Sequence, residues 1–371
     1  MLQPFPSVAS AKEDSFLQRR RIVAIPACNE AEHIVPCLLA LARQEGLKPH
    51  KVVLWVNNTQ DDTCERALSL LPKLPYELDV VSVTYSPDNA HAGRARRDAM
   101  CHATLGAPDD ALLFTTDADA EVASDWMQKT LEAFSRFNVA AVFGRALLLP
   151  DEALKIPAHL HQDDDREQAY GALLEQITAK MNPEPHDPWP RHAEHSGASI
   201  AVTHEAWKQV GGIPLIPSGE DRAFYHALRR THFPVRHSPD VKVYVSARFV
   251  GRARGGMAET LARRVIAQDD YIDEALEPVS ARMLRVRQYL SQRQGSRTQD
   301  SFVERTVNPS PIRRAELHLH HQRAERVIAF LNRSRAGLQA LVHQRSALFQ
   351  DDTISNVRCN PLPKSAPNRL V

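Results

Sequence analysis

Short β-rich runs alternate with helical stretches through most of this sequence, and this alternation limits the possible folds more than any other feature. Apolar, β-branched runs occur at residues 22–25, 52–56, 79–83, 111–115 and 139–143. Helices are predicted between them, at residues 31–43, at residues 61–71 and after Gly93. Because parallel strands need a crossover, usually a helix, this order is typical of βαβ units. We therefore predict an α/β domain with a mostly parallel sheet flanked by helices.

The later part of the chain continues with the same elements in a less regular order. Helices are predicted at residues 166–181, 205–210 and 220–230, and strands at residues 196–202 and 241–245. The prolines within residues 182–191 exclude a regular element there. Beyond Gly256 the sequence becomes rich in Arg and Gln, and an amphipathic helix is predicted over residues 327–342. We predict a disordered leader (1–20), an α/β domain (21–255) and a helical C-terminal region (256–371), with the boundary near Gly255-Gly256.

Composition narrows the class of protein. Lys and Arg (46) nearly balance Asp and Glu (45), so net charge gives no reason to expect nucleic acid or an anionic membrane as the main partner. The 5 cysteines form no C-x-x-C pair, which fits a reducing compartment. Acidic residues occupy the place of a signal peptide's apolar region, and no run approaches about 18 apolar residues. We predict a cytoplasmic protein without an integral membrane segment.

Two aspartates follow the fourth predicted strand. Asp117 and Asp119 lie where the chain leaves the sheet, and in open α/β sheets ligands bind at the carboxyl ends of the strands. Carboxylates of this kind suit Mg²⁺ or Mn²⁺ carrying a substrate diphosphate. Ordinary turn and cap chemistry is the alternative for this pair. For the similar run at residues 163–165, which follows no strand, we predict a solvated acidic loop.

A second acidic pair opens a predicted helix. Glu220 and Asp221 follow Pro217-Ser218-Gly219. Acids in a first helical turn are favoured by the helix dipole, so capping is the simple interpretation. The functional interpretation is a general base that takes the proton from an acceptor hydroxyl.

Basic residues offer further candidates. Arg94, Arg96 and Arg97 lie at a helix start beside Gly93, which suits a phosphate or a base carbonyl, although such residues are more often a solvated helix face. Further candidates, for binding the molecule that carries this acceptor hydroxyl, are His195, Ser196, Gly197, Arg252 and Arg254. A lone histidine is more often structural than catalytic, and Arg248, Arg252 and Arg254 could pair with surface acids.

Taken in order, these pieces resemble the family 2 glycosyltransferases, whose catalytic domain has the nucleotide-binding fold called GT-A. The matching segments are Ile25-Pro26-Ala27-Cys28-Asn29-Glu30, Asn57-Asn58-Thr59-Gln60-Asp61-Asp62-Thr63, Gly93-Arg94-Ala95-Arg96, Thr116-Asp117-Ala118-Asp119, Gly197-Ala198-Ser199 with Gly211-Gly212, and Gly219-Glu220-Asp221. They span about residues 21–245, and their order and placement after strands are specific.

The resemblance implies roles for several residues. It assigns Pro26, Glu30 and Asn57 to the donor nucleotide, and Arg96 to its base or diphosphate. It implies that Asp117 and Asp119 form the D-x-D pair, of which Asp119 holds Mn²⁺ or Mg²⁺. It also implies that Asp221 is the general base of an inverting enzyme, with Glu220 beside it near the acceptor.

The chain also departs from the family's pattern. Asn57 and Asn58 stand where an aspartate commonly contacts the base, so the base is not assigned. Many members place a metal-binding histidine after a late strand, but Ser246 follows Val245 here, so no third metal ligand is assigned. The Q-x-x-R-W motif of processive members is absent, which disfavours a polysaccharide synthase.

These observations predict a metal-dependent, inverting, non-processive glycosyltransferase that uses a nucleotide diphosphate sugar and an unidentified acceptor. A nucleotidyltransferase is one alternative, although Ala27-Cys28-Asn29-Glu30 is not the Gly-rich, basic loop typical of that class. A binding protein with an Arg-rich C-terminal region is another. A dehydrogenase is excluded because no G-x-G-x-x-G follows the first strand. We expect the C-terminal region to pack on the catalytic domain or to form a homodimer, and not to bind nucleic acid.

Overall fold

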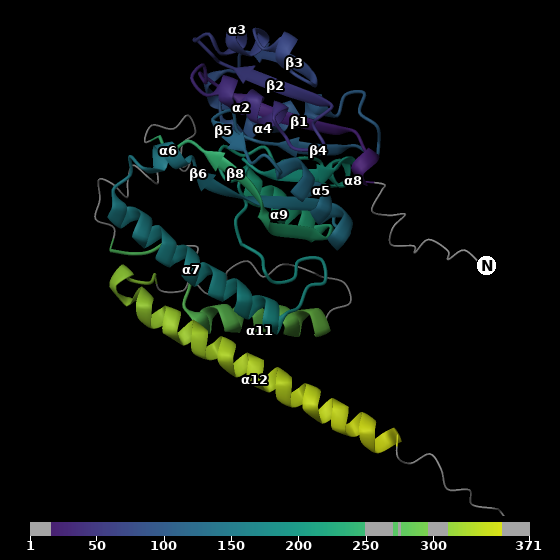
Figure 1. Cartoon of the computed structure of the whole chain (residues 1–371), viewed down its shortest axis with the longest axis vertical. Coiled ribbons are helices and arrows are strands. Elements are labelled where there is room, and N and C mark those ends of the chain that lie inside the picture. The colour runs from purple at the N-terminus through teal and green to yellow at the C-terminus, as the bar shows by residue number, and fades with distance from the viewer. Residues whose placement is uncertain (1–15, 249–269, 274–275, 296–310, 351–371) are drawn as a thin grey trace, which may run out of the picture. The chain divides into compact units, whose positions relative to one another are not determined.

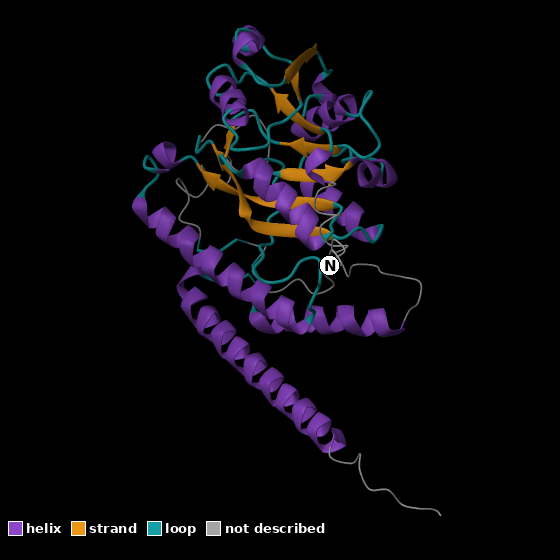
Figure 2. Ribbon diagram, turned by 45° about the vertical axis from the view of Figure 1, so that its right-hand side comes forward, coloured by secondary structure: helices purple, strands orange, loops and turns teal. Residues whose placement is uncertain are grey.

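A single sheet organises the chain. The computed structural model describes residues 16–248, 270–273, 276–295 and 311–350, and within these it contains an eight-stranded sheet in the order β3-β2-β1-β4-β7-β6-β8-β5 (Figure 1). The strands are β1 (Arg21–Ala27), β2 (Lys51–Asn57), β3 (Glu77–Val83), β4 (Leu112–Thr115), β5 (Ala120–Val122), β6 (Ala141–Leu148), β7 (Ile200–Thr203) and β8 (Val235–Val245). Figure 2 shows these strands between helices.

The helices include all those that the sequence predicts. They are α2 (Ile34–Ala42), α3 (Thr63–Leu68), α4 (Ala92–Ala103), α5 (Trp126–Phe137), α6 (Pro150–Ala153), α7 (Ala158–Met181), α8 (His204–Val210), α9 (Glu220–Arg230), α11 (Val279–Gly295) and α12 (Leu317–Gln350), with 3₁₀ turns η1 (Leu71–Lys73), η2 (Pro87–Asn89) and η3 (Arg314–Glu316). Helices α5 and α6 and strand β5 are additional to the prediction. A three-residue strand such as β5 is too short to show a period of two.

The predicted α/β class is confirmed, and the sheet, which was predicted to be mostly parallel, is mixed. The pairs β3-β2, β2-β1, β1-β4 and β6-β8 are parallel. Strand β7 runs antiparallel to both of its neighbours, and β5 runs antiparallel to β8. Because β7 is reversed, its first residues lie at the edge of the sheet where β4 ends.

Alternating side chains of β1 explain why helices cover both faces of the sheet. Val23 and Ile25 belong to one buried cluster, together with residues of α2 and α5. Ile22 and Ala24 belong to the other, together with residues of α4, α8 and α9. Successive strand residues point to opposite faces, so a continuous apolar run requires cover on both sides. Strand β1 also continues through Pro26, where the sequence had suggested its end.

Helix α7 begins earlier than predicted and corrects one expectation. Residues 163–165, predicted to form a solvated acidic loop, lie within α7. Asp163 pairs with Arg314 at 3.2 Å, so part of the run faces the C-terminal region. A run of acids without a strand before it was insufficient to distinguish a loop from an amphipathic helix.

The C-terminal region contributes α11, which packs against α7. The chain divides into two compact units, residues 1–324 and residues 325–371, and α12 begins in the first unit and continues in the second. The amphipathic helix predicted at residues 327–342 lies within α12. The predicted boundary at Gly255-Gly256 lies outside the described residues and stays a prediction. At the other end, Phe16 from the predicted leader stacks on Phe134, with ring centroids 5.5 Å apart.

Among the helices that the structure describes, none has the length and apolar character needed to cross a membrane.

Candidate active site

The predicted site residues gather at one edge of the sheet. The turns after β1, β2 and β4 emerge there, because these strands are parallel. Strand β7 is antiparallel to β4, with Thr115 paired to Ile200, so the segment before β7 lies at the same edge. Strand β8 ends beside β5, with Val245 paired to Ala120. The sheet order thus brings together five segments that are far apart in the sequence.

Arg96 is the buried centre of this edge. Its guanidinium lies 2.7 Å from Asp117 and 3.1 Å from Glu220, and it also donates to the carbonyl of Gly197 at 2.9 Å. A further hydrogen bond, of 3.2 Å, reaches the hydroxyl of Thr115. Burial alone would lower the pKa of Arg96, but the two carboxylates outweigh it and raise the pKa. Arg96 therefore does not lie on a solvated helix face, and it holds both acidic motifs together.

The glycines of two motifs are required by close approach to other groups. A Cβ on Gly197 would lie 2.6 Å from Cζ of Arg96. A Cβ on Gly93 would lie 2.2 Å from the carbonyl oxygen of Ile216. Both distances are far below van der Waals contact, so any other residue would displace α4 or the segment packed on it. These glycines let α4 approach the acidic edge.

The other arginines of α4 have structural partners. Arg94 pairs with Asp98 at 2.6 Å, and its guanidinium lies 5.5 Å from the centre of the Tyr85 ring. Arg97 donates to the carbonyl of Ile213. Of the three arginines in the motif, Arg96 is thus the one that contacts the acidic residues described above.

The turns after β1 and β2 are tied to each other. Asn29 and Asn58 both adopt a positive φ, of 53° and 48°, which asparagine tolerates better than most residues. The backbone N–H of Asn29 donates to Thr59 Oγ1 at 3.1 Å, and that of Glu30 donates to Thr63 Oγ1 at 2.9 Å. The turn after β1 therefore depends on side chains from the turn after β2.

The three residues assigned to the donor by resemblance all lie near these turns. Pro26 is within β1, paired with Trp55, and Asn57 is the buried last residue of β2. Glu30 is also buried, and its carboxylate accepts hydrogen bonds from Arg248. Burial would raise the pKa of Glu30, but the hydrogen bonds from His33 and Arg248 outweigh it and lower the pKa.

Arg248 links the donor side to the second aspartate of the D-x-D sequence. It lies 2.8 Å from Asp119 Oδ2 as well as 2.8 Å from each carboxylate oxygen of Glu30. From its sequence context, Arg248 could have paired with surface acids. The acids are instead partly or fully buried ones at the site, so that expectation is corrected.

Asp117 and Asp119 fit one mode of metal binding. Among the described residues, no group of three or more His, Cys, Asp or Glu side chains is arranged to hold a metal ion. Mg²⁺ is commonly held by one or two carboxylates, with waters and substrate phosphates completing its shell. Asp117 and Asp119 match that donor set. Burial, together with the charge of Asp117, raises the pKa of Asp119 to about 6 against the opposing effect of Arg248.

Asp221 is connected to Arg96 through the backbone of Gly197 and through its neighbour Glu220. Its Oδ2 accepts the backbone N–H of Gly197 at 3.0 Å, and its neighbour Glu220 is held by Arg96. Burial and the adjacent charge of Glu220 raise the pKa of Asp221, while backbone N–H groups oppose the shift. A carboxyl group with a raised pKa, oriented by a backbone N–H, is suited to proton transfer.

The candidate acceptor residues are only partly placed. Ser196 accepts the backbone N–H of Ala198 at 3.3 Å, and Gly197 contacts both Arg96 and Asp221. His195 lies two residues away, but its ring packs on Tyr225 with centroids 4.1 Å apart. Burial lowers the pKa of His195 well below its usual value, so the ring is neutral. Arg252 and Arg254 lie outside the described residues.

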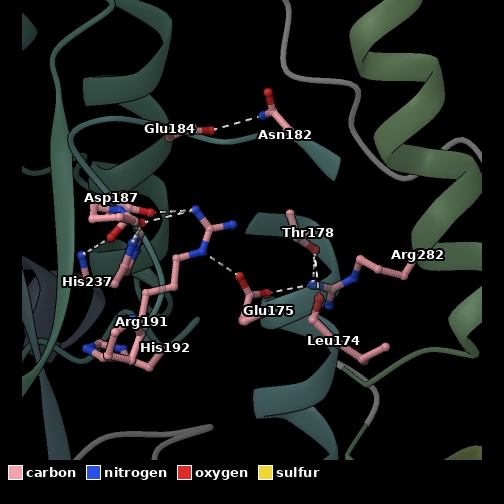
Figure 3. A network of polar contacts seen from close by, with 12 residues as sticks. Leu174, Glu175, Thr178, Asn182, Glu184, Asp187, Arg191, His192, His237 and Arg282 are labelled. Atoms are coloured by element: carbon pink, nitrogen blue, oxygen red, sulfur yellow. Dashed lines mark hydrogen bonds and ion pairs between the residues drawn. The ribbon is translucent and has the colours of Figure 1, made fainter. Parts of the chain in front are cut away.

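A buried polar network surrounds the proline-rich connection that precedes His195 and Gly197 in the chain (Figure 3). Asp187 accepts hydrogen bonds from His237 Nδ1 at 2.8 Å and from Arg236 at 3.0 Å. Arg191 bridges Asp187 and Glu175 of α7 at 3.5 Å and 3.1 Å. The network ties the proline-rich connection to β8 and α7.

Arg248 was noted in the sequence only as a possible partner of surface acids, and His33 and Cys37 were not selected at all. Arg248 is 218 positions from Glu30, so no local spacing relates the two. His33 lies 3.2 Å from Glu30 at i, i+3, a helical spacing that could have indicated it. The thiol of Cys37 donates to the carbonyl of Asp117 at 3.4 Å, and burial raises its pKa, so it is an inert support of that turn.

Part of the chain matches a known protein family. Residues 22–183 match the family described as glycosyl transferase family 2. The resemblance proposed from the motifs is therefore confirmed. The matched residues include the donor turns, Arg96 and the pair Asp117 and Asp119, whereas Glu220 and Asp221 lie beyond them.

Solved structures of glycosyltransferases are similar to this chain at low identity. The mannosyltransferase PcManGT from Pyrobaculum calidifontis, in complex with GDP-Man and Mn²⁺, is 17% identical with a TM-score of 0.46, over 91% of this chain and 86% of that one. S. aureus TarS 1–349 with UDP-GlcNAc is 13% identical with a TM-score of 0.47, over 86% and 92%. Glucosyl-3-phosphoglycerate synthase from Mycobacterium tuberculosis, with Mn²⁺, UDP and phosphoglyceric acid, is 14% identical with a TM-score of 0.39, over 77% and 84%. A comparison with curated proteins gave no match.

Proposed function

We propose that this glycosyltransferase transfers a sugar from a nucleotide diphosphate donor to an acceptor hydroxyl with inversion, and that it needs a divalent metal. The observation that carries the proposal is the position of Asp221. Its carboxylate is oriented by the Gly197 N–H, and Gly197 also contacts Arg96, which pairs with Asp117 at 2.7 Å. A candidate base and a candidate diphosphate site are thus joined through a single buried arginine.

The donor side of the proposal uses groups that suit a nucleotide diphosphate. Asp117 and Asp119 would hold Mn²⁺ or Mg²⁺, which supplies positive charge for the leaving diphosphate when bound. Asn57 and the turn containing Glu30 lie at the ends of β2 and β1, where a nucleotide is expected in open α/β sheets. Arg96 keeps a positive charge beside Asp117, which stabilises this carboxylate at the buried edge.

The acceptor side of the proposal assigns the proton to Asp221. As the acceptor oxygen bonds to the anomeric carbon, its proton passes to the Asp221 carboxylate. The bond from the anomeric carbon to the diphosphate oxygen breaks, and the nucleotide diphosphate leaves with the electron pair. Glu220 is held by Arg96 at 3.1 Å, which leaves Asp221 as the acid assigned to this transfer.

The family match favours this proposal over the two alternatives. A nucleotidyltransferase and a binding protein without catalysis would each leave the glycosyltransferase domain unexplained. Non-processive transfer, a cytoplasmic location, a possible homodimer and the lack of nucleic-acid binding all remain predictions from sequence. The acceptor is not identified by these residues.

Replacement of Asp221 tests the proposed base. Asp221→Asn keeps the shape of the side chain and removes its basicity. General base catalysis is typically worth about 10²–10⁴-fold, so kcat should fall by that order, while the affinity for the donor stays near that of the wild type. Steady-state kinetics with a panel of nucleotide sugars, and calorimetric donor binding, would measure both quantities.

Asp240→Asn provides the matched control, because Asp240 is an exposed aspartate of β8. It should leave kcat unchanged. Near-normal turnover by Asp221→Asn would remove the base assignment. A product that keeps the donor's anomeric configuration would instead indicate a retaining enzyme, in which Asp221 orients the acceptor.

A further inference from the structure

Arg248 contacts two carboxylates that belong to different parts of the site. Its guanidinium lies 2.8 Å from both oxygens of Glu30 and 2.8 Å from Asp119 Oδ2. Glu30 follows β1, Asp119 precedes β5, and Arg248 follows β8. The contact with Asp119 matters most, because Asp119 is the carboxylate to which the proposed function assigns the metal. A guanidinium and a divalent cation would both seek the same oxygen.

The surroundings of Arg248 allow it to change partners more easily than Arg96 can. Arg96 is 6% exposed and is held by a backbone carbonyl and a hydroxyl as well as two carboxylates. Arg248 is 21% exposed, and the contacts described for its guanidinium are with two carboxylates and with no backbone carbonyl. Glu30 also contacts His33 at 3.2 Å, so it keeps a polar partner if Arg248 moves.

The backbone before Arg248 is anchored, so a change of partner needs only rotations of the side chain. Glu152 of α6 accepts hydrogen bonds from the hydroxyl of Ser246 at 2.8 Å and from the backbone N–H of Ala247 at 2.6 Å. The backbone N–H of Ser246 donates to the carbonyl of Asp119 at 3.1 Å. The Cα of Arg248 therefore stays near Asp119 whichever group its guanidinium contacts.

We propose that Arg248 competes with the divalent cation for Asp119 and, once displaced, binds the donor's diphosphate. This inference rests on the proposed function. Two like charges at one carboxylate oxygen repel each other, so metal binding requires the guanidinium to leave. The apparent affinity for metal is then reduced by the fraction of molecules in which Asp119 is occupied. A freed guanidinium matches phosphate oxygens in a bidentate manner, which gives it a natural second partner.

Mn²⁺ binding to the full-length protein without nucleotide tests the competition directly. Free Mn²⁺ would be measured by electron paramagnetic resonance for the wild type, R248Q, R248K and the control R20Q. Arg20 is 42% exposed and pairs with Glu77 near the start of β3, at the opposite end of that strand from the site. We expect R248Q to bind Mn²⁺ about tenfold more tightly than the wild type, equivalent to about 1.4 kcal/mol, and R20Q to match the wild type.

Nucleotide binding at saturating Mn²⁺ tests the second half of the inference. UDP and GDP would be titrated calorimetrically, and whichever binds would be compared across the variants. R248Q should bind it about tenfold more weakly, because a charge-assisted bidentate contact is lost. R248K keeps the charge without the planar fork and should lie between the two. Tighter metal binding combined with weaker nucleotide binding is not expected from a merely structural residue.

Equal or weaker Mn²⁺ binding by R248Q would overturn the inference, as would failure of both proteins to bind Mn²⁺. If R248Q unfolds at a lower temperature than the wild type, R248K serves for the same comparison. Sugar transfer by the wild type, assayed in parallel, separates two kinds of failure. If the wild type transfers sugar but replacement of Arg248 leaves the Mn²⁺ affinity unchanged, this inference alone is contradicted. If the wild type transfers no sugar from any nucleotide sugar, the proposed function is contradicted.

Discussion

Asp117 and Asp119 share a short turn after β4 but have different surroundings. The side chain of Asp119 is 18% exposed and that of Asp117 is 32% exposed. Asp117 pairs with the fixed guanidinium of Arg96, whereas Asp119 pairs with the more exposed Arg248. This difference supports Asp119 as the principal metal ligand and gives Asp117 a share in holding the edge together.

The first residue-scale prediction concerns metal dependence. Asp119→Ala should remove the increase in nucleotide affinity that Mn²⁺ gives, because the metal joins this carboxylate to the diphosphate. In the wild type the Mn²⁺ affinity should fall as the pH drops below about 6, because the carboxyl group must lose its proton to bind metal. Calorimetric titrations at pH 5, 6 and 7 would measure both effects. Nucleotide affinity that is unchanged in EDTA would contradict the metal assignment.

His192 gives the second residue-scale prediction, on stability and pH. Its Nε2 lies 3.2 Å from the carbonyls of Phe143 and Ser238, and its Nδ1 accepts the N–H of Glu194. Burial lowers the pKa of His192 to about 3. The folded protein thus keeps the ring neutral, whereas the unfolded chain takes up a proton below about pH 6.5. The free energy of unfolding should therefore fall as the pH falls through that value.

The effect can be isolated by comparing the wild type with His192→Gln. Between pH 7.5 and pH 5.5, His192 alone should cost about 1.4 kcal/mol of stability in the wild type, and this part of the loss should be missing in the variant. Asp119 has a raised pKa and acts in the opposite direction, but it does so equally in both proteins. Urea denaturation would measure the difference, with exposed His159→Gln as the control. The same pH dependence in His192→Gln and the wild type would rule out the effect.

At the scale of elements, α11 is joined to α7 through buried charges. Arg282 of α11 is 8% exposed and donates to Glu175 of α7 at 2.6 Å, and it also contacts Glu277 just before α11. Glu175 in turn pairs with Arg191 of the network in Figure 3. A buried network of this kind holds only while each charge keeps its partner.

We predict that Arg282→Ala destabilises the protein strongly. Removing one member of a buried ion pair leaves its partners uncompensated and typically costs about 3–5 kcal/mol. Arg287→Ala is the matched control, because Arg287 is an exposed arginine of the same helix. Chemical denaturation of both variants would measure the cost. A loss for Arg282→Ala no larger than that for Arg287→Ala would mean that this network contributes little to stability.

At the scale of the whole molecule, the first compact unit runs through residue 324 and includes α11. Tyr170 and Ile177 of α7 are fully buried, and the hydroxyl of Tyr170 donates to the carbonyl of Glu277 at 2.8 Å. Arg314 pairs with Glu167 of α7 at 2.9 Å. The described residues after 255 therefore cover part of α7 and contribute to its polar contacts.

This arrangement predicts different outcomes for two truncated chains. A chain ending at residue 255 should aggregate or unfold at a much lower temperature, since burial of a large apolar side chain is worth about 1.5–3 kcal/mol. A chain ending at residue 324 keeps the first compact unit and should retain its fold and sugar transfer. Light scattering, thermal unfolding and transfer assays would compare them. A monodisperse, stable and active chain ending at residue 255 would refute the structural role of the C-terminal region.

The sequence by itself determined the order of strands and helices through most of the α/β domain. Apolar runs and helical periodicity are local properties, so they can be read from neighbouring residues. The same holds for the polar turns after β1, β2 and β4, which is why Glu30, Asp117 and Asp119 could be selected. Prediction from sequence failed where an element was very short, as with β5. It also failed at residues 163–165, where an acidic run did not distinguish a helix from a loop.

Only the tertiary structure decided which of these turns meet and what lies between them. The reversal of β7 places Gly197 against Arg96 and Asp221, and the pairing of β8 with β5 places Arg248 beside Asp119. Such contacts join residues up to 218 positions apart. They depend on strand order and direction, which are set by packing of the whole sheet rather than by any local pattern, and no local spacing encodes them.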